Sequence, residues 1–543
     1  MSNAYFKVPQ PINEPIKTYK PGSPEREELK KKIAELRSKE IEVPLIIGGE
    51  EVKTGDTEVM RIPHNHGHKL GVYHKAGKKE VEMAIDAALK ARKEWAEMPW
   101  EQRVSVFLKA ADLLAGSWRS TLNASTMLGQ SKVVHQAEID SACELIDFYR
   151  FNCYFMTGLM DEQPYSPYGM WNRSEYRPLE GYIFAVTPFN FTSIAGNLPT
   201  APVMVGNVSL WKPASSAVYS AYYLMRLFEE AGLPKGVINF VPGSGGQVGI
   251  PAMSNPNLAG IHFTGSTAVF QNMWKVISDN LKVMKYYPRI VGETGGKDFI
   301  FAHNSADVDA LVVAAIRGAF EYQGQKCSAA SRMYIPKSIW GEFKEKYVSE
   351  VKKLKMGDVE DFTNFMSAVI DKNAFDSITG YIKFAKDSKE AEIITGGGFD
   401  DSKGYFIEPT TIVTANPKFK TMEEEIFGPV LSIYVYEDNK FDEALDLCDQ
   451  TSPYALTGCV WAQDRKAILK MSNKLRDAAG NFYINDKPTA AVVGQQPFGG
   501  GRASGTNDKA GSGMNLMRWM TARTIKETFE PPKDWRYPFM IEK

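Results

Sequence analysis

The sequence predicts an α/β protein with two large domains, the first of which is built on a parallel, doubly wound sheet. Its 543 residues exceed the roughly 250 to 300 residues at which a single hydrophobic core stops growing. From residue 181 onward, short β-branched runs alternate with helical stretches, the order of strands and crossover helices in a parallel sheet. The composition, 43% hydrophobic and 24% charged, is that of an ordinary globular protein.

The first 150 residues are expected to be mostly helical. Ser23 and Pro24 suit the cap and the first position of a helix, and apolar residues then recur at helical spacing. Two more amphipathic patterns follow over residues 80–99 and 100–118. The apolar stripes of the first two helices are Leu29, Ile33 and Leu36, and then Val81, Ile85, Ala88, Leu89 and Trp95.

The next part of the chain supplies the strands of the first sheet. These are the runs GYIFAV, SLWKP, VINFVP and GIHFTG, with a helix over SSAVYSAYYLMRLFEEAG. A second α/β series begins near RIVGET and FIFAH, with a helix from Asp307 to Tyr322 that Asn304 and Ser305 are expected to cap. Short strands that end in Pro, Gly or Thr place polar loops at their carboxyl ends, where ligands bind in this architecture.

Two segments suggest contacts between subunits. The stretch SPYGMWNRSEYRPLEGY has the alternation and turns of a β-rich excursion, and the tail TIKETFEPPKDWRYPFM has few means of burying its aromatic residues within its own chain.

The bulk composition argues against several classes of protein. A formal net charge of -1 lacks the basic excess that binding to nucleic acid phosphates requires. No apolar run approaches the roughly 18 to 20 residues of a membrane span, and the N-terminus lacks an apolar signal core. Because Glu14 precedes the first arginine, Arg26, the start does not look like an Arg-rich presequence, so the cytoplasm is favoured over the mitochondrial matrix.

The cysteines and histidines give no sign of a metal site. Five cysteines are scattered along the chain without a CxxC pair, which argues against a disulfide framework and a cysteine-based zinc site. The segment HNHGH, with His64, His66 and His68, lacks a further ligand and is better explained by polar side chains that face solvent from one strand.

One cysteine, Cys327, has the surroundings of a nucleophile. It follows a predicted helix and a Gly-Gln-Lys turn and precedes small residues, so its sulfur can lie in an open, tightly built backbone environment. Lys326 beside it is expected to favour the thiolate. The other four cysteines lie in apolar or helical runs and are interpreted as core residues.

A thiolate nucleophile needs an acid-base group and an oxyanion stabiliser. Glu293, at a strand end and followed by Gly295 and Gly296, has confined surroundings that can raise a carboxyl pKa into the range of a general base. Asn190, between two aromatic residues in TPFNFTS, can donate an amide N–H to an oxyanion. Both residues could instead serve only the turns in which they lie.

Two further strand ends are candidates for a cofactor site. Lys212 in WKPAS could hold a ribose or phosphate, and Gly265 and Ser266 in FTGSTAVF form a strand-to-helix turn that suits a pyrophosphate. Neither segment is a GxGxxG fingerprint, and the Gly-rich VPGSGGQVG is equally an ordinary strand-to-helix turn.

Taken together and in this order, PFNF, WKPA, FTGS, GETGGK, GQKCSA, EEIFGPV and QPFGG resemble the aldehyde dehydrogenase superfamily. Within it, PHNH, GETGGKDF, GQKCSAASR, VGQQPFGGGRASGTNDK and the long N-terminal arm resemble the branch of Δ1-pyrroline-5-carboxylate (L-glutamate γ-semialdehyde) dehydrogenases. The resemblance covers nearly the whole chain. It implies the aldehyde dehydrogenase fold: a Rossmann-like dinucleotide-binding domain, an α/β catalytic domain and a β-rich oligomerisation excursion.

The resemblance implies specific roles for the motif residues. Cys327 matches the nucleophile, Glu293 the general base, and Asn190, with the backbone N–H of Cys327, the oxyanion hole. Glu425 matches the residue that holds the nicotinamide ribose. The positions expected to contact the dinucleotide are Pro188, Lys212, Gly265, Ser266, Glu425 and Phe427. The segment GSTAVF departs from other branches, with Phe270 where they have a third Gly.

It also implies a substrate site for an amino-acid aldehyde. Phe191 and Phe498 match an aromatic pair that encloses the aliphatic chain of the semialdehyde. The groups expected to anchor its carboxylate and amino ends are Lys326, Ser328 and the loop Thr489-Ala490-Ala491, where several members carry Gly-Ser or Gly-Ala. Glu144 matches a helix glutamate near the site.

The implied division assigns residues 1–158 and 180–291 to NAD binding with an N-terminal helical arm, 292–506 to catalysis, and 159–179 with 507–543 to oligomerisation. A homodimer or higher oligomer is expected, which binds the small-molecule substrate and neither nucleic acid nor a membrane; binding to a separate proline-oxidising protein stays open. The small Ser215 and Ser216 leave NADP open, although the resemblance favours NAD.

The expected activity is oxidation of glutamate γ-semialdehyde to glutamate through a cysteine thioester, in proline catabolism. The alternatives are a broader-specificity or acyl-CoA-forming aldehyde dehydrogenase, and a noncatalytic structural member of the fold. The chain is too short to add a flavin domain for proline oxidation.

Overall fold

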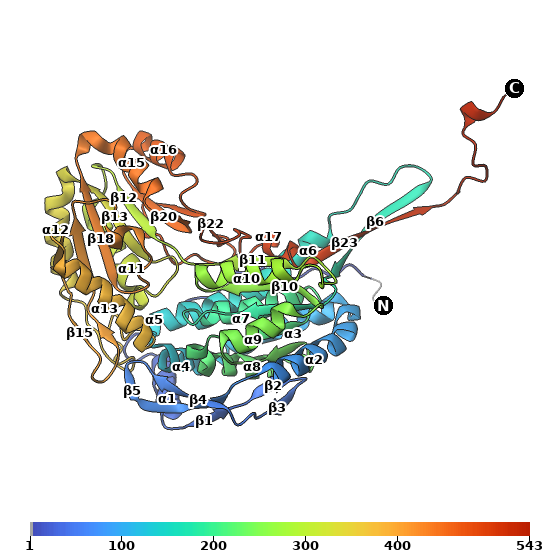
Figure 1. Cartoon of the computed structure of the whole chain (residues 1–543), viewed down its shortest axis with the longest axis horizontal. Coiled ribbons are helices and arrows are strands. Elements are labelled where there is room, and N and C mark those ends of the chain that lie inside the picture. Colours follow the sequence, from blue (N-terminus) through green and yellow to red (C-terminus); the bar gives the residue numbers. More distant parts are fainter. Residues whose placement is uncertain (1–3, 543) are drawn as a thin grey trace.

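The computed structural model describes residues 4–542, and its two large sheets each have seven strands (Figure 1). The first sheet has the order β11-β10-β7-β8-β9-β2-β3. Its first five strands in this order, from β11 to β9, are parallel. The strands are β2 (Leu45–Ile47), β3 (Glu50–Val52), β7 (Tyr182–Val186), β8 (Ser209–Lys212), β9 (Ile238–Phe240), β10 (Leu258–Thr264) and β11 (Arg289–Glu293).

Helices cover both faces of this sheet. Helix α7 packs against β7 and β8 on one face, with α3, α6 and α8 outside it, and α2 packs against β8 and β9. These helices are α2 (Lys78–Glu97), α3 (Trp100–Ala115), α6 (Leu145–Met160), α7 (Thr192–Met204), α8 (Val218–Ala231), α9 (Gly245–Ser254) and α10 (Thr267–Asn280). The remaining N-terminal helices are α1 (Pro24–Arg37), α4 (Arg119–Gln130), α5 (Val134–Ala137) and the π-helix η1 (Glu138–Glu144).

The second sheet has the order β14-β17-β18-β13-β12-β20-β21 and is parallel except at β14. In β12, Phe299 and Phe301 enter one hydrophobic cluster while Ile300 and Ala302 enter another, because successive side chains of a strand point to opposite faces. The strands are β12 (Asp298–Ala302), β13 (Ala330–Pro336), β14 (Ala391–Thr395), β17 (Thr410–Thr414), β18 (Val430–Tyr436), β20 (Thr457–Trp461) and β21 (Asn481–Ile484). Its helices are α11 (Val308–Phe320), α12 (Lys337–Val351), α13 (Lys372–Asp387), α15 (Phe441–Gln450) and α16 (Arg465–Lys474).

A two-stranded antiparallel ribbon extends away from both sheets (Figure 1). It pairs β6 (Met170–Pro178) with β23 (Met520–Thr528), and the tail beyond it exposes Trp535 and Phe539. The excursion and the tail predicted from the sequence thus lie together. No helix within residues 4–542 is long and apolar enough to cross a membrane.

The expectation of a mostly helical start is only partly correct. Between α1 and α2 the chain forms β2, β3 and a three-stranded sheet of β1 (Ile41–Val43), β4 (Thr57–Ile62) and β5 (Asn65–His74). His64, at the turn before β5, does not face solvent: it is buried, with Nδ1 2.8 Å from the Ser131 hydroxyl and Nε2 3.3 Å from Asp358.

Two further expectations for the second half are wrong. RIVGET does not begin the second sheet but forms β11, the edge of the first, since β11 pairs in parallel with β10. Helix α11 is capped by Asp307, which accepts a hydrogen bond from the Ala310 N–H, and it ends at Phe320. The chain passes from the first sheet to the second between Glu293 and Asp298, so GETGGK joins the two sheets.

Candidate active site

A cavity of about 410 Å³ is lined by strands β10 and β11 of the first sheet, by α11 and the turn that leads from it to β13 of the second sheet, by the N-terminal segment and by the loop before β22 (Gly501–Arg502). Of the predicted catalytic and substrate residues, ten line it: Glu144, Phe191, Glu293, Lys326, Cys327, Ser328, Thr489, Ala490, Ala491 and Phe498. Residues that are far apart in the sequence therefore meet in one place.

Cys327 reaches the cavity through a sharp reversal after α11. Tyr322 and Gln323 adopt left-handed φ values of 52° and 55°, and Gly324 follows at 65°. A Cβ atom at Gly324 would lie 2.2 Å from the Gly428 carbonyl oxygen, so only glycine allows this approach. The reversal ends at Cys327, whose side chain is buried and which lies three residues before β13.

The surroundings of Cys327 keep its thiol neutral. Burial raises the pKa of the thiol well above its usual value, and the carboxylates of Asp298, Glu425 and Glu293 raise it further. The expectation that Lys326 favours the thiolate is wrong for this state of the protein, because the Lys326 ammonium is paired with Glu321 at 3.0 Å.

Glu293 ends β11 and points into the cavity against a glycine pair. Its Oε2 accepts a hydrogen bond of 3.1 Å from the Gly500 N–H, and a Cβ atom at Gly499 would lie 2.9 Å from Oε1. Burial raises the pKa of the Glu293 carboxyl well above its usual value, although the Gly500 N–H and Lys509 oppose the shift. The direction is the one expected of a general base that works near neutral pH.

Asn190 is buried and reaches the turn that carries Cys327. Its amide donates a hydrogen bond of 3.0 Å to the Gln325 carbonyl, two residues before the cysteine. The rings on either side are held in place: Phe189 packs edge-on against Phe427 at 5.8 Å, and the Lys132 ammonium lies 4.1 Å from the centre of the Phe191 ring. Asn190 does not itself line the cavity.

The expected cofactor residues gather at one edge of the first sheet. Lys212 is the last residue of β8, and Pro188 and Gly265 follow β7 and β10, so all three lie at the carboxyl ends of their strands, the edge at which ligands bind in such sheets. Burial lowers the pKa of the Lys212 ammonium to about 8. The Ser266 hydroxyl caps α10 by accepting from the Val269 N–H.

Glu425 reaches this edge from the second sheet's side. Its Oε1 accepts a hydrogen bond of 2.9 Å from the Gly296 N–H, and a Cβ atom at Gly295 would lie 2.1 Å from Oε2. Burial raises the pKa of the Glu425 carboxyl to about 7. Phe427, two residues later, has a left-handed φ of 57°. The carboxylate, the amine and the helix N-terminus fit the ribose and phosphate groups of a dinucleotide.

Phe270, in the segment GSTAVF, has a packing role. Its ring stacks on Phe263 at 5.4 Å with an interplanar angle of 9°, and it fills the space where a Gly292 side chain would be. Phe270 therefore packs α10 against β10 and β11.

The expected substrate residues line the same cavity as Cys327 and Glu293. Phe498 is held by paired backbone hydrogen bonds with Ala510, and the Ser328 hydroxyl lies 2.8 Å from that of Thr489. Glu144 ends η1, and its Oε2 accepts a hydrogen bond of 2.9 Å from the Ser193 hydroxyl. Burial raises the pKa of the Glu144 carboxyl to about 8, with a further contribution from Asp140.

Ala490 gives a prediction about backbone strain. Its φ of 70° lies in the left-handed region, where a Cβ atom is unfavourable. Ala490→Gly should therefore raise the free energy of unfolding by about 0.5 to 1 kcal/mol. Chemical denaturation would measure it, with Ala491→Gly as the matched control, which should lower stability instead. A lower free energy of unfolding in Ala490→Gly would show that the backbone at Ala490 is not strained.

The cavity also contains residues that sequence reasoning missed. Asp147 follows Glu144 by one helical turn, a spacing that could have drawn attention to it. Asn13, Glu14 and Ile16 line the cavity from the N-terminal segment. These three residues belong to no motif. Because they lie far along the chain from the other lining residues, no local pattern in the sequence points to them.

Comparisons with known proteins give one consistent picture. Residues 52–525 match the model of the aldehyde dehydrogenase family. The chain is 54% identical over 542 residues to the mitochondrial Delta-1-pyrroline-5-carboxylate dehydrogenase of Dictyostelium discoideum, covering 99% of this chain and 97% of that one. Its human counterpart is 48% identical over 529 residues, covering 97% and 94%.

Solved structures agree with these relatives. The Delta-pyrroline-5-carboxylate dehydrogenase of Mycobacterium tuberculosis bound with NAD superposes with a TM-score of 0.96 at 50% identity and covers 100% of both chains. A 1-pyrroline-5-carboxylate dehydrogenase from Thermus with bound NAD gives 0.91 at 34% identity, covering 96% of this chain and 100% of that one.

Proposed function

Because the chain belongs to the aldehyde dehydrogenase family, we propose that it oxidises L-glutamate γ-semialdehyde to L-glutamate with NAD, a reaction of proline catabolism. The observation that carries this proposal is the single cavity in which Cys327 and Glu293 lie beside an aromatic pair and a polar anchoring loop. Full-length relatives named Delta-1-pyrroline-5-carboxylate dehydrogenase support the substrate.

The first steps belong to Cys327 and Asn190. The Cys327 thiol gives its proton to water, and its sulfur forms a bond to the aldehyde carbon, whose oxygen becomes an oxyanion. The Asn190 amide, held near Cys327 through Gln325, and the Cys327 backbone N–H are proposed to donate to that oxyanion. Donors of this kind are worth about 3 to 4 kcal/mol each.

NAD, when bound, accepts the hydride that converts the adduct into a thioester on Cys327. Glu425 is proposed to hold the ribose, Lys212 a ribose or phosphate, and the start of α10 at Gly265 and Ser266 the pyrophosphate. Pro188 and Phe427 are proposed to contact the same cofactor. Phe427 has a left-handed backbone conformation, and the Glu425 carboxyl packs closely on Gly295, so both residues are held in place.

Glu293 completes the cycle by taking a proton from water. The resulting hydroxide attacks the thioester carbon, and the C–S bond breaks to release glutamate and restore the Cys327 sulfur. The position of the Glu293 carboxylate in the same cavity as Cys327 supports water rather than coenzyme A as the acceptor.

The amino-acid part of the substrate is assigned to the other predicted residues that line the cavity. Phe191 and Phe498 are proposed to enclose its aliphatic chain. Its charged groups are assigned to Lys326, Ser328, Ala490, Ala491 and Glu144, which line the cavity.

A substrate panel tests this assignment. Propanal has the reacting aldehyde but neither the α-carboxylate nor the α-ammonium, and each lost hydrogen bond to a charged group costs roughly 1.5 to 3 kcal/mol. The kcat/KM for propanal should therefore be at least about 100-fold below that for glutamate semialdehyde, measured from NADH absorbance. Equal use of both would favour a broad-specificity aldehyde dehydrogenase, and no turnover of any aldehyde would favour a noncatalytic member.

Oligomeric state and location are part of the same proposal. The exposed aromatic residues on the ribbon and tail, including Trp171 and Trp535, support a homodimer in which these segments pack on a second copy. We place the protein in the cytoplasm on its sequence, although relatives from eukaryotes are named as mitochondrial.

A further inference from the structure

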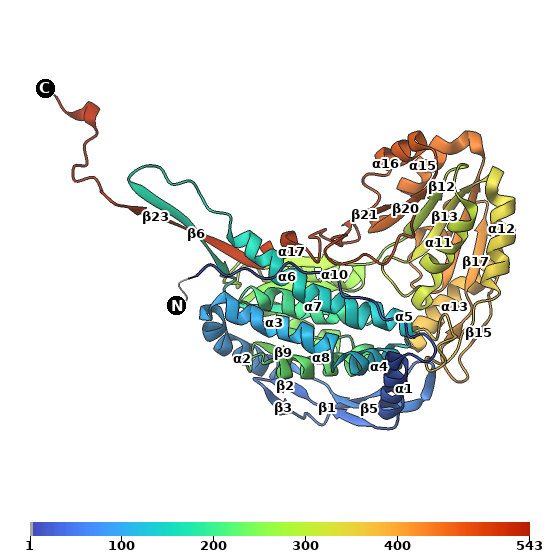
Figure 2. The same ribbon diagram turned by 180° about the vertical axis from the view of Figure 1, so that it is seen from behind.

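The N-terminal segment 13–19, which we call the strap, crosses the wall of the cavity before the chain enters α1. Figure 2 shows this dark blue segment running beside α6 and α5 toward α1. The strap contains no helix or strand, yet Asn13, Glu14 and Ile16 all line the cavity. An extended segment can hold such a position only through contacts with the rest of the protein.

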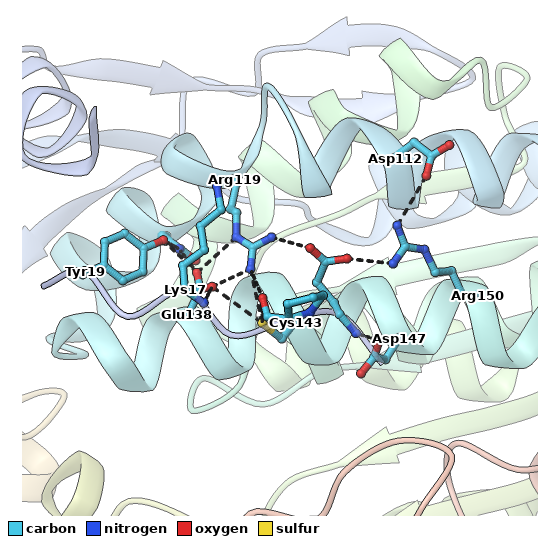
Figure 3. Close-up of polar contacts among 11 residues, drawn as sticks. Lys17, Tyr19, Asp112, Arg119, Glu138, Cys143, Asp147 and Arg150 are labelled. Atoms are coloured by element: carbon cyan, nitrogen blue, oxygen red, sulfur yellow. Dashed lines mark hydrogen bonds and ion pairs between the residues drawn. The ribbon is translucent and has the colours of Figure 1, made fainter. Parts of the chain in front are cut away.

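Glu138 fixes one end of the strap (Figure 3). Its carboxylate accepts hydrogen bonds of 2.8 Å from the Lys17 backbone N–H and from the Tyr19 hydroxyl. Glu138 is fully buried, and it also pairs with Arg119. Burial opposes ionisation of Glu138, but Arg119 outweighs it and holds the pKa of the carboxyl below its usual range.

Glu14 fixes the middle of the strap between two arginines. Its Oε1 accepts from Arg119 at 2.6 Å and its Oε2 from Arg150 at 2.7 Å. Arg119 also donates to the Pro15 carbonyl at 2.9 Å. Since the Glu14 side chain is only 12% exposed, these charged hydrogen bonds are shielded from water, where such pairs matter most.

Asn13 connects the two walls of the cavity. Its amide donates hydrogen bonds of 2.8 Å to the Asp147 carboxylate, on α6, and to the Val493 carbonyl, in the loop after Ala490 and Ala491. Its carbonyl oxygen accepts a bond of 2.9 Å from Gln495. The Glu14 backbone N–H donates to the other oxygen of Asp147 at 2.8 Å.

We infer that Asn13 is a positioning residue that holds the anchoring loop 489–495 against α6 and thereby sets the affinity for the amino-acid end of the substrate. This inference rests on the proposed function only for the identity of that substrate. Asn13 acts through the loop, whose Ala490, Ala491 and Val493 line the cavity, and not on the reacting atoms. The ties at Glu14 and Glu138 keep Asn13 in place.

The test is Asn13→Ala in the full chain, measured with two aldehydes. Asn13→Ala loses both hydrogen bonds to the loop, the one to Val493 and the one from Gln495. At about 1 kcal/mol each, their loss should raise KM for glutamate semialdehyde roughly 30-fold, while kcat stays within about twofold. KM for propanal, which lacks the amino-acid end, should not change. Asn13→Asp has the same shape but cannot donate and faces the Asp147 carboxylate, so its KM should rise at least as much.

Ile12→Ala provides the matched control, because Ile12 is the neighbouring residue and is 81% exposed. Its KM should equal that of the unaltered protein. An Asn13→Ala variant with unchanged KM for the semialdehyde, or with equal KM increases for both aldehydes, would overturn the inference.

Hydrogen exchange separates this inference from the proposed function. In the absence of substrate, the amides of residues 489–496 should exchange faster in Asn13→Ala than in Ile12→Ala, whatever the enzyme oxidises. Unchanged exchange would overturn the role of Asn13. If Asn13→Ala exchanges faster but the substrate panel shows no preference for the semialdehyde, the proposed substrate would be refuted. The inference that Asn13 positions the loop would still hold.

Discussion

Replacing Cys327 by alanine should lower NADH formation from glutamate semialdehyde by roughly 10⁴-fold or more. Without the sulfur, no covalent adduct can form at the aldehyde carbon, and the remaining groups only bind and polarise the substrate. The side chain is small and buried, so its removal should leave the cofactor edge of the first sheet intact. Steady-state absorbance would give the rate, and a fluorescence titration should show NAD affinity within about threefold of the unaltered protein.

Cys143→Ala is a suitable control for this result. Cys143 also lines the cavity, and burial likewise raises the pKa of its thiol, but it lies beside Arg119 and away from the expected acid-base group. Its rate should stay within about threefold of the unaltered protein. Substantial turnover by Cys327→Ala, or a comparable loss in Cys143→Ala, would refute the assignment of the nucleophile.

Replacing Glu293 by glutamine should separate the two halves of the reaction. Glutamine keeps an oxygen that can accept from the Gly500 N–H but cannot take a proton from water. The first turnover should therefore give a burst of NADH at nearly the normal rate, followed by a steady state at least about 100-fold slower. Stopped-flow absorbance would resolve both phases, and a steady-state rate equal to that of the unaltered protein would rule out Glu293 as the base.

The same residue gives a pH dependence with a definite sign. Because the base must be ionised, the steady-state rate should fall as the pH drops through the pKa of Glu293. Burial raises that pKa, so the fall should occur at higher pH than an ordinary glutamate would give. This fall in rate at low pH should be absent from Glu293→Gln, because glutamine does not titrate.

The sequence predicted those parts of the fold that depend on local patterns. The strands β7, β8 and β10 are short apolar runs, and α1 and α2 have amphipathic spacing, so each could be recognised without knowledge of its partners. RIVGET was placed in the wrong sheet because order along the chain does not reveal which strands pair. Strand β11 closes the first sheet, and the second begins only four residues after it.

In the candidate site, too, residues in local motifs could be predicted and residues that depend on distant contacts could not. Cys327, Glu293 and Glu425 lie in motifs, and the structure brings all three to the junction of the two sheets. Asn13 could not be found in this way, because its partners Asp147 and Val493 lie more than a hundred residues away. The state of the Cys327 thiol was also misjudged, because Lys326 is adjacent in sequence but forms its ion pair with Glu321.

The central claim is that substrate becomes covalently attached to Cys327 and is released by water that Glu293 activates. Mass spectrometry of Glu293→Gln, mixed with NAD and glutamate semialdehyde and quenched after the burst, tests it most directly. We expect the peptide that contains Cys327 to carry the glutamyl group as a thioester, in an amount equal to the burst. A burst with no added mass on this peptide, or with the group on another cysteine, would contradict the account.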